Sequence, residues 1–335
     1  MPSRLPNLKF FSGRSNLPLA ESIVNYDGFK LSESEIIDFA NKEIKVKIKE
    51  SIRGEDVFIL QTCCQPDPNK WLMELLIMAH TVKMASAKRI TAVVPYIYGS
   101  RQDRKAEPRT PITIQLVGSL FKAAGIHNLI TVSLHNHASV GAFNDIIVDN
   151  ISSFPAFIKD ISQLIREEEK DNDFIVLSPD SGGVERAKQF ANYFQIDLGF
   201  TYKTRPQDNV SKVLAFVGDV KDKNVLIVDD IVDTAGTLIE VAKQAKERGA
   251  KKVFVCVTHA VLSGNAIQKI NDSVIDRMYV SNSISHEALP DKIRVIDIGP
   301  LLGEVILRVN GDKSVGELFE DASSLQKILK EKKHG

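Results

Sequence analysis

Short apolar runs alternate with longer stretches of helical periodicity along almost the whole chain. Apolar runs of this length predict buried strands, at 56–60, 90–94, 129–132, 174–177 and 225–228. Helices are predicted between them, for example at 71–85 and at 112–124, where Gly125 is suited to the C-cap. Strands that alternate with helices predict an α/β fold with two tandem open, mainly parallel sheet domains.

Two polar stretches predict structure that protrudes from this framework. Residues 44–48 alternate apolar and charged side chains, which predicts a strand with one wet face, as in an edge or protruding strand. Residues 203–212 are polar, contain a proline and carry cations at Lys203 and Arg205. They predict either a mobile surface hairpin or a lid whose cations close over phosphate groups.

The most informative polar stretch follows the predicted strand at 225–228. Asp229 and Asp230 come directly after it, and Asp233 leads into the small-residue turn 234–237, where a helical pattern begins. The first turn of a helix offers N–H groups and a positive dipole end to a phosphate, and threonine hydroxyls add donors. The acidic pair suits ribose hydroxyls or a bridging Mg²⁺. The alternative interpretation is an ordinary core strand and helix cap.

Other polar turns follow other predicted strands, and open parallel sheets bind ligands at such strand ends. The turn 178–183 can bring backbone close to a diphosphate, and its Asp180 could reach a metal-bridged ligand. In the loop 96–105, tyrosine rings could face a purine and Arg101 and Arg104 could meet phosphates; a solvated basic loop is the alternative. His135 and His137 follow strand 129–132, at a position suited to a metal or a phosphate.

Composition excludes several classes of protein. Lys plus Arg and Asp plus Glu both total 43, so no basic excess points to nucleic acid, and no GxxxxGK[ST] motif is present. The N-terminus lacks the apolar stretch of a signal peptide, and no apolar run is long enough for a membrane span. Three cysteines in 335 residues do not form a disulfide framework. We therefore expect a cytoplasmic protein that contacts no membrane.

The length suits two domains of ordinary size. We expect an N-terminal domain at 1–151, completed by 305–322, a second domain at 152–304, and a charged tail at 323–335.

Several motifs, in this order, resemble those of the ribose-phosphate pyrophosphokinase (PRPP synthase) family. They are Phe-Ser-Gly at 11–13, SIRGEDV at 51–57, LMELLIM at 72–78, Arg-Gln-Asp at 101–103, VGDVKD at 217–222, the loop 229–237 and Thr-His at 258–259. The resemblance implies domains of the phosphoribosyltransferase-like type. It also implies the reaction in which ATP and ribose 5-phosphate give PRPP and AMP, with Mg²⁺, for nucleotide biosynthesis.

The resemblance also implies roles for individual residues. The catalytic cations are Lys203 and Arg205, and the metal ligands are His135 and Asp180. The ATP-binding residues are Phe39, Asn41, Glu43, Arg101, Gln102 and Asp103. The ribose 5-phosphate-binding residues are Asp180, Asp229, Asp230, Asp233, Thr234, Ala235, Gly236 and Thr237. Because a neighbouring subunit supplies part of the adenine loop in the family, a homo-oligomer built from dimers, often a hexamer, is implied.

One departure from the family pattern concerns the metal-associated histidine. The family has Asp-Leu-His where this chain has Ser133, Leu134 and His135. A carboxylate two residues from a ligand can act through the outer shell of a metal site, so we still expect catalysis.

Two other functions share part of this pattern. A noncatalytic regulatory relative of the synthase would resemble it over the whole chain but tends to lose the ribose 5-phosphate loop, which is intact here. A phosphoribosyltransferase that consumes PRPP would share the loop but has no need of Arg101, Gln102 and Asp103.

Three further residues, Ser51, Arg53 and Arg109, resemble positions near an allosteric phosphate and ADP site of the family. For the two arginines, surface salt bridges are the alternative.

Overall fold

The computed structural model describes residues 8–168, 174–207 and 210–320. The chain divides into two compact units. Unit 1 comprises the described parts of 1–155 and 297–335 with residues 283–285, and unit 2 comprises the described parts of 156–282 with 286–296. The sequence places these boundaries at 151/152 and 304/305, and the tail at 323–335 lies outside the described residues.

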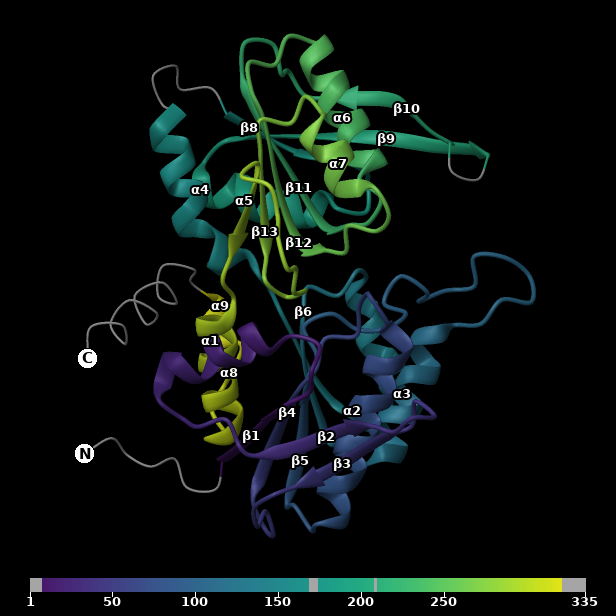
Figure 1. Ribbon diagram of the computed structural model, residues 1–335. Coiled ribbons are helices and arrows are strands. Elements are labelled where there is room, and N and C mark those ends of the chain that lie inside the picture. The colour runs from purple at the N-terminus through teal and green to yellow at the C-terminus, as the bar shows by residue number, and fades with distance from the viewer. Residues whose placement is uncertain (1–7, 169–173, 208–209, 321–335) are drawn as a thin grey trace. The chain divides into compact units, whose positions relative to one another are not determined.

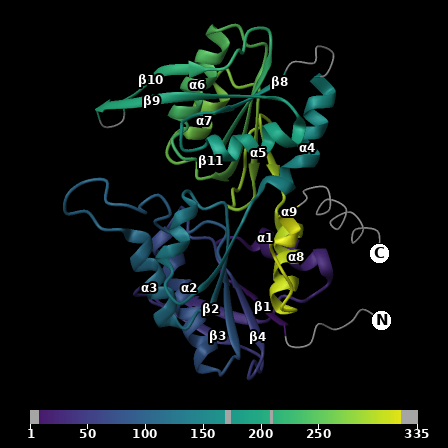
Figure 2. The same cartoon turned by 180° about the vertical axis from the view of Figure 1, so that it is seen from behind.

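Unit 1 is built on a five-stranded parallel sheet in the order β1-β4-β5-β6-β7. Its strands are β1 (Leu8–Ser12), β4 (Asp56–Leu60), β5 (Arg89–Val93), β6 (Asn128–Val132) and β7 (Ile147–Ile151). Its helices are α1 (Leu17–Asp27), α2 (Pro68–Met84), α3 (Thr113–Ala124), the 3₁₀ helix η1 (His137–Ala142), α8 (Gly299–Asn310) and α9 (Glu317–Glu320). Helices α2 and α3 lie on one face of the sheet and α1 packs beside α8 on the other (Figures 1 and 2).

A separate antiparallel pair, β2 (Ser34–Asp38) and β3 (Ile44–Ile48), joins unit 1. Strand β3 has the half-exposed alternation that its sequence predicts. Ile36, Val46 and Ile48 pack against the core formed by α2, α3 and the parallel sheet, and Figure 1 shows the hairpin lying across α2. Strand β2 does not follow from the sequence, because Ser-Glu-Ile-Ile-Asp alternates too little to mark one face.

Unit 2 contains a seven-stranded sheet in the order β10-β9-β8-β11-β12-β13-β14, parallel except for the β9–β10 pair. Its strands are β8 (Phe174–Ser178), β9 (Asp197–Gln207), β10 (Val210–Val217), β11 (Asn224–Val232), β12 (Val253–Ala260), β13 (Arg277–Ser281) and β14 (Ile293–Ile296). Its helices are α4 (Phe154–Glu168, most of which belongs to this unit), α5 (Val184–Phe194), α6 (Gly236–Glu247) and α7 (Ala266–Asn271).

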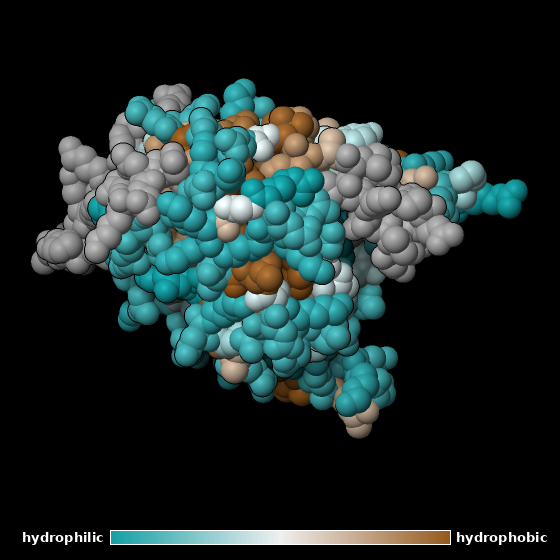
Figure 3. Space-filling view, turned by 90° about the horizontal axis from the view of Figure 1, so that it is seen from above, coloured by the Kyte–Doolittle hydropathy of each residue, from teal (hydrophilic) through white to brown (hydrophobic). Residues whose placement is uncertain are grey.

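The predicted α/β class with two open, mainly parallel sheets is confirmed. Strand β11 extends beyond its predicted end at Val228, through both aspartates to Val232, because the neighbouring β12 pairs with it along that length. Strands β9 and β10 extend into the polar stretch 203–212 and pair there, as the predicted hairpin would, and the role as a lid stays a prediction. Hydrophilic residues predominate on the face shown in Figure 3, and hydrophobic ones form small patches. None of the described helices combines the length and the apolar composition that a bilayer-spanning helix needs.

Candidate functional site

Strands β8 and β11 are parallel neighbours at the centre of the unit 2 sheet, so their carboxyl ends lie at the same edge. Strand β8 runs into the turn 179–183 and helix α5, and β11 runs into the turn 233–235 and helix α6. The turns that the sequence predicts as ligand sites are thus brought together by the pairing of two strands, which is where open α/β sheets bind ligands.

The turn after β8 holds Asp180 in one orientation. The backbone N–H of Gly183 donates to Asp180 Oδ1 at 3.0 Å, and Ser178 Oγ donates to the Asp180 carbonyl at 2.7 Å. A Cβ at Gly183 would lie 2.8 Å from Ser178 Oγ, so a larger residue there would displace the hydroxyl that bonds to the Asp180 carbonyl. One carboxylate oxygen of Asp180 therefore fixes the turn.

Asp229 and Asp230 lie within β11, one buried and the other nearly so. Their side chains are 14% and 4% exposed, and the N–H of Asp230 donates to Asp229 Oδ1 at 2.9 Å. Burial raises the pKa of Asp229 well above its ordinary value, and the adjacent charge of Asp230 raises it further. Two carboxylates held this closely out of water need a partner that donates protons or carries positive charge.

Arg186 supplies part of that charge. Its Nη1 lies 3.3 Å from Asp230 Oδ1 and 3.6 Å from Asp229 Oδ1, and its side chain is 21% exposed. It lies in the first turn of α5, three residues after Gly183. Arg186 was not predicted from the sequence, and the only sequence signal for it is its place one turn beyond a ligand-type loop. Arg186 also lowers the pKa of Asp229, but less than burial and Asp230 raise it.

We call Asp180, Arg186, Asp229 and Asp230 the acidic edge. Arg186 contacts the carboxylates of Asp229 and Asp230, and Asp180 adds to the rise in the Asp229 pKa, so three carboxylates of this edge outnumber its one cation. Such an edge favours ligands that bring hydroxyl donors or a metal ion.

The turn between β11 and α6 has a different character. Ala235 adopts a left-handed conformation with φ 62°, and the first turn of α6 has no side-chain cap. Thr234 and Gly236 are exposed, and a Cβ added to Gly236 would meet no atom within 4 Å. The N–H groups of this first turn are therefore open to an anion next to the acidic edge. Asp233 and Thr237, half-buried, flank the same turn.

The predicted catalytic cations Lys203 and Arg205 lie in β9, and only their backbone is within the described structure. Strand β9 pairs with β8 as far as Ser178 and Phe200, and then continues with β10 as its partner. Both residues thus belong to the part of β9 that extends past the end of β8, at the same edge as Asp180.

In unit 1 the predicted ATP-binding segment follows β5. Gln102 is anchored to the start of α3, because Thr113 Oγ1 donates to Gln102 Oε1 at 2.5 Å, and Arg101 is exposed. Ser139 Oγ in η1 lies 3.4 Å from Asp103 Oδ2, so this segment lies beside the loop that carries His135. Phe39, Asn41 and Glu43 are exposed in the turn between β2 and β3.

His135 is exposed at the end of β6, two residues beyond Ser133. Ser133 has a left-handed conformation with φ 44°, and its hydroxyl accepts the N–H of Ser153 at 3.2 Å. Ser133 therefore ties the end of β6 to the segment after β7. Among the residues that the structure describes, no group of three His, Cys, Asp or Glu side chains could by itself hold a metal ion. His135 belongs to unit 1 and Asp180 to unit 2.

The chain matches two protein-family models and is similar to several known proteins. Residues 8–125 match a model described as the N-terminal domain of ribose phosphate pyrophosphokinase, and residues 199–320 match a phosphoribosyl synthetase-associated domain. A ribose-phosphate pyrophosphokinase of Thermosipho africanus is 47% identical over 312 residues, which cover 93% of this chain and 97% of the relative. One from Thermotoga maritima is 44% identical over 312 residues, covering 93% and 98%.

A solved structure is similar over nearly the same extent. The phosphoribosylpyrophosphate synthetase of Mycobacterium smegmatis has 36% identity and a TM-score of 0.82, covering 91% of this chain and 99% of its own. These relatives match both units and the segments between them, whereas the loop 229–237 alone would match only one turn of unit 2.

Proposed function

This chain belongs to the ribose-phosphate pyrophosphokinase family, and from that premise we propose how its residues carry out the reaction. The chain is an enzyme that transfers the β,γ-diphosphoryl group of ATP to the 1-hydroxyl of ribose 5-phosphate, giving PRPP and AMP for nucleotide biosynthesis. The observation that carries the proposal for its site is the acidic edge beside the uncapped first turn of α6.

Ribose 5-phosphate matches this surface at both of its ends. Its 5-phosphate would accept hydrogen bonds from the N–H groups of Ala235, Gly236 and Thr237 and from the hydroxyl groups of Thr234 and Thr237. Its ribose hydroxyls would donate to the carboxylates of Asp229 and Asp230, with Asp233 supporting the turn. Because Arg186 already neutralises part of the pair, neutral hydroxyl donors can bind there without a second cation.

For ATP, we propose that the turn of the β2–β3 hairpin contacts the adenine through Phe39, Asn41 and Glu43. Arg101 would contact the phosphates, and Gln102 and Asp103 would hold that loop against α3 and η1. An exposed phenylalanine next to hydrogen-bonding side chains is suited to a flat heteroaromatic ring.

Enzymes of this kind use a divalent metal ion, and we propose Mg²⁺. Asp180 fits it, because its carboxylate is preorganised by the Gly183 N–H and presents a hard oxygen donor, and His135 would lie near the metal. When bound, Mg²⁺ would neutralise charge on the ATP phosphates. Mg²⁺ commonly takes only one or two protein carboxylates together with substrate phosphates.

The protein's part in the transfer is alignment and neutralisation of charge. The 1-hydroxyl of ribose attacks the β-phosphorus, the bond to the α-phosphate oxygen breaks, and AMP leaves with that oxygen. Lys203 and Arg205, on the extension of β9, would stabilise the negative charge that develops on the transferred group. Closure of the β9–β10 hairpin would exclude water, which otherwise competes as the acceptor.

We propose that the enzyme assembles as a homo-oligomer based on dimers, as the hexamers of its family are. Its three cysteines, all free and buried, suit the reducing conditions of the cytoplasm.

The direct test incubates the purified protein with ATP, ribose 5-phosphate and Mg²⁺ and measures AMP and PRPP together. We expect the two products in equal amounts, and neither product when ribose 5-phosphate is omitted. If neither product forms although ATP or ribose 5-phosphate binds, the chain is a regulatory relative, and the next assay adds an active synthase subunit. Release of diphosphate from PRPP when a nucleobase is added as acceptor, without ATP, would identify a PRPP-consuming transferase instead.

A further inference from the structure

The turn of the β2–β3 hairpin, residues 39–43, is stabilised by hydrogen bonds within itself. The N–H of Phe39 donates to the Glu43 carbonyl at 2.8 Å, and the N–H of Lys42 donates to the Phe39 carbonyl at 2.8 Å. Asn41 Oδ1 accepts the N–H of Glu43 at 3.1 Å, and Lys42 adopts φ 71°. The shape of the turn is therefore set within residues 39–43, and its position must be set from outside.

Apolar packing secures the body of the hairpin but not the direction of its turn. Ile36, Val46 and Ile48 pack against the unit 1 core, and β3 lies against α2. This attachment is non-directional, and a two-stranded hairpin is only marginally stable by itself. A small tilt or slide of the hairpin would keep these contacts and move Phe39.

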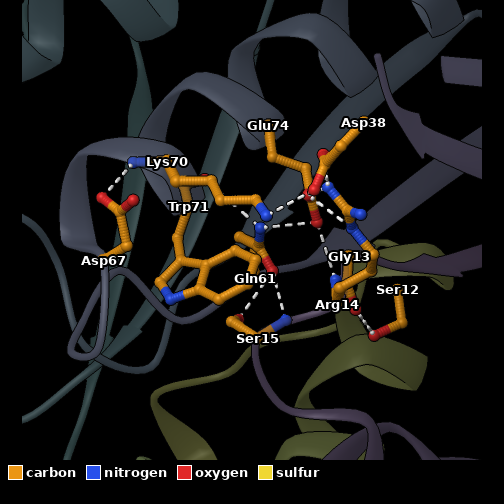
Figure 4. A network of polar contacts seen from close by, with 10 residues as sticks. All are labelled: Ser12, Gly13, Arg14, Ser15, Asp38, Gln61, Asp67, Lys70, Trp71 and Glu74. Atoms are coloured by element: carbon orange, nitrogen blue, oxygen red, sulfur yellow. Dashed lines mark hydrogen bonds and ion pairs between the residues drawn. The ribbon is translucent and has the colours of Figure 1, made fainter. Parts of the chain in front are cut away.

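Asp38, the last residue of β2, is held from two directions. Its Oδ1 accepts Arg14 Nη2 at 2.7 Å, and its Oδ2 accepts Lys70 Nζ at 2.7 Å (Figure 4). Arg14 lies in the turn between β1 and α1, and Lys70 in the first turn of α2. Because each carboxylate oxygen is bonded to a cation from a different segment, the end of β2 is fixed against both.

Arg14 is itself held firmly by Glu74, whose side chain is fully buried in α2. Glu74 Oε2 accepts Arg14 Nε at 2.9 Å and Nη2 at 2.7 Å, and Oε1 accepts the backbone N–H of Arg14 at 2.7 Å. Gln61 Nε2 donates to Glu74 Oε1 at 3.1 Å, and a Cβ at Gly13 would collide with the Gln61 amide. We call Arg14, Asp38, Lys70 and Glu74 the hairpin brace.

We propose that Asp38, held by Arg14 and Lys70, is a positioning residue for nucleotide binding, because it fixes the place of the Phe39–Glu43 turn. This inference rests on the proposed role of that turn in binding adenine. The side chains of Asp38, Arg14 and Lys70 are each about 30% exposed. Ion pairs this exposed contribute little to stability, so their main effect falls on the geometry of the turn that follows Asp38.

The charge on Asp38 is present at every pH at which the enzyme would be assayed. Hydrogen bonds from Arg14 and then from Lys70 lower the pKa of Asp38 to about 2. Removing the charge therefore requires substitution, and Asp38→Asn keeps the shape of the side chain while weakening both bonds.

The test measures ATP dissociation constants by calorimetry on the full-length protein without ribose 5-phosphate, so that it does not depend on turnover. For Asp38→Asn we expect the ATP dissociation constant to rise roughly three- to tenfold, the range of one weakened charge-assisted hydrogen bond. Asp38→Glu should recover part of the loss. The matched control is Glu35→Gln, which removes the same charge from the same strand and should leave ATP binding within about twofold.

A second readout separates positioning from general loss of structure. Lys70→Met combined with Asp38→Asn should weaken ATP binding no more than the stronger single change, because both remove one interaction. Hydrogen exchange at 39–43 should become faster in Asp38→Asn, with no change in β4 or β5. An unchanged ATP dissociation constant in Asp38→Asn would overturn the inference. Failure of the wild type to form PRPP, with ATP binding intact, would instead contradict the proposed function.

Discussion

The acidic edge of unit 2 and the hairpin brace of unit 1 contain the same kinds of side chain in opposite balance. In the acidic edge, three carboxylates outnumber one guanidinium, and the pKa of Asp229 is raised well above its ordinary value. In the hairpin brace, two carboxylates meet two cations, and the pKa of Asp38 is lowered to about 2.

The difference separates a charge cluster suited to binding a ligand from a charge cluster that stabilises local structure. In the acidic edge the protein leaves repulsion between buried carboxylates incompletely neutralised, which a bound sugar or metal ion can relieve. In the hairpin brace every carboxylate already has its cation, so no ligand is needed. Substitutions in the two clusters should therefore change different quantities.

The largest effect should come from Lys203 and Arg205, the cations of the β9 extension for which we propose a catalytic role. Lys203→Ala should lower kcat by roughly two orders of magnitude, by analogy with removal of a preorganised charge-stabilising donor. Steady-state kinetics would measure this, with Lys212→Ala, a cation on the facing strand β10, as the matched control. A kcat within threefold of wild type for Lys203→Ala would remove that residue from the catalytic site.

Arg186→Met tests whether the edge needs its one cation. Loss of the guanidinium leaves Asp229 and Asp230 more repulsive and less well oriented, so the KM for ribose 5-phosphate should rise about tenfold or more. The KM of Arg186→Lys for ribose 5-phosphate should lie between those of wild type and Arg186→Met, because an ammonium keeps the charge but lacks the planar guanidinium. Equal KM values for ribose 5-phosphate in all three proteins would show that Arg186 has no part in binding ribose 5-phosphate.

Asp229→Asn tests the cost of the carboxylate pair to the folded protein. A raised pKa means that ionisation of Asp229 costs more in the folded than in the unfolded state, so its contribution to stability falls as pH rises from about 4 through the folded pKa. At neutral pH the variant should therefore melt about 1–3 °C above wild type in calorimetry without ligand. In the hairpin brace the sign should reverse, with Asp38→Asn melting at or below wild type. A lower Tm for Asp229→Asn would contradict the claim of stored repulsion.

The smallest effect should come from Ser133, which stands where the family has aspartate. Its left-handed backbone accepts aspartate, and its hydroxyl bonds to Ser153, accepting the Ser153 N–H at 3.2 Å and donating to Ser153 Oγ at 3.3 Å. Ser133→Asp should fold and change the Mg²⁺ concentration at half-maximal rate by less than about tenfold. A complete loss or a hundredfold gain of activity would show that this position decides catalysis.

The turn between β11 and α6 is formed by consecutive residues, so its structure could be predicted from the local sequence. The apolar run before Asp229 predicts a strand, and the small residues after Asp233 predict a turn and a helix start; the structure has both, and the role of the loop 229–237 as a ligand site stays a prediction. For strand pairing, the sequence predicts parallel sheets but not the order of the strands in them. The sequence does not state that β8 and β11 are neighbours, yet this pairing brings Asp180 beside Asp229.

Residues whose partners are far along the chain were not predictable in this way. Arg186 lies in a helix whose other polar residues are mostly solvated, and only the packing of α5 against the sheet turns it toward Asp229 and Asp230. Asp38 meets Arg14 across 24 positions and Lys70 across 32, with no periodicity that links them. Helix α4 and strand β7, adjoining the domain boundary, also were not predicted, because Asp149 and Asn150 interrupt the apolar pattern of β7.

A crossed kinetic measurement tests the central comparison most directly. It determines the KM for ATP and the KM for ribose 5-phosphate in wild type, Arg186→Met and Asp38→Asn under identical conditions. We expect Arg186→Met to raise only the KM for ribose 5-phosphate and Asp38→Asn to raise only the KM for ATP. If both variants raise the same constant, or both constants equally, the acidic edge and the hairpin brace do not have the separate roles described.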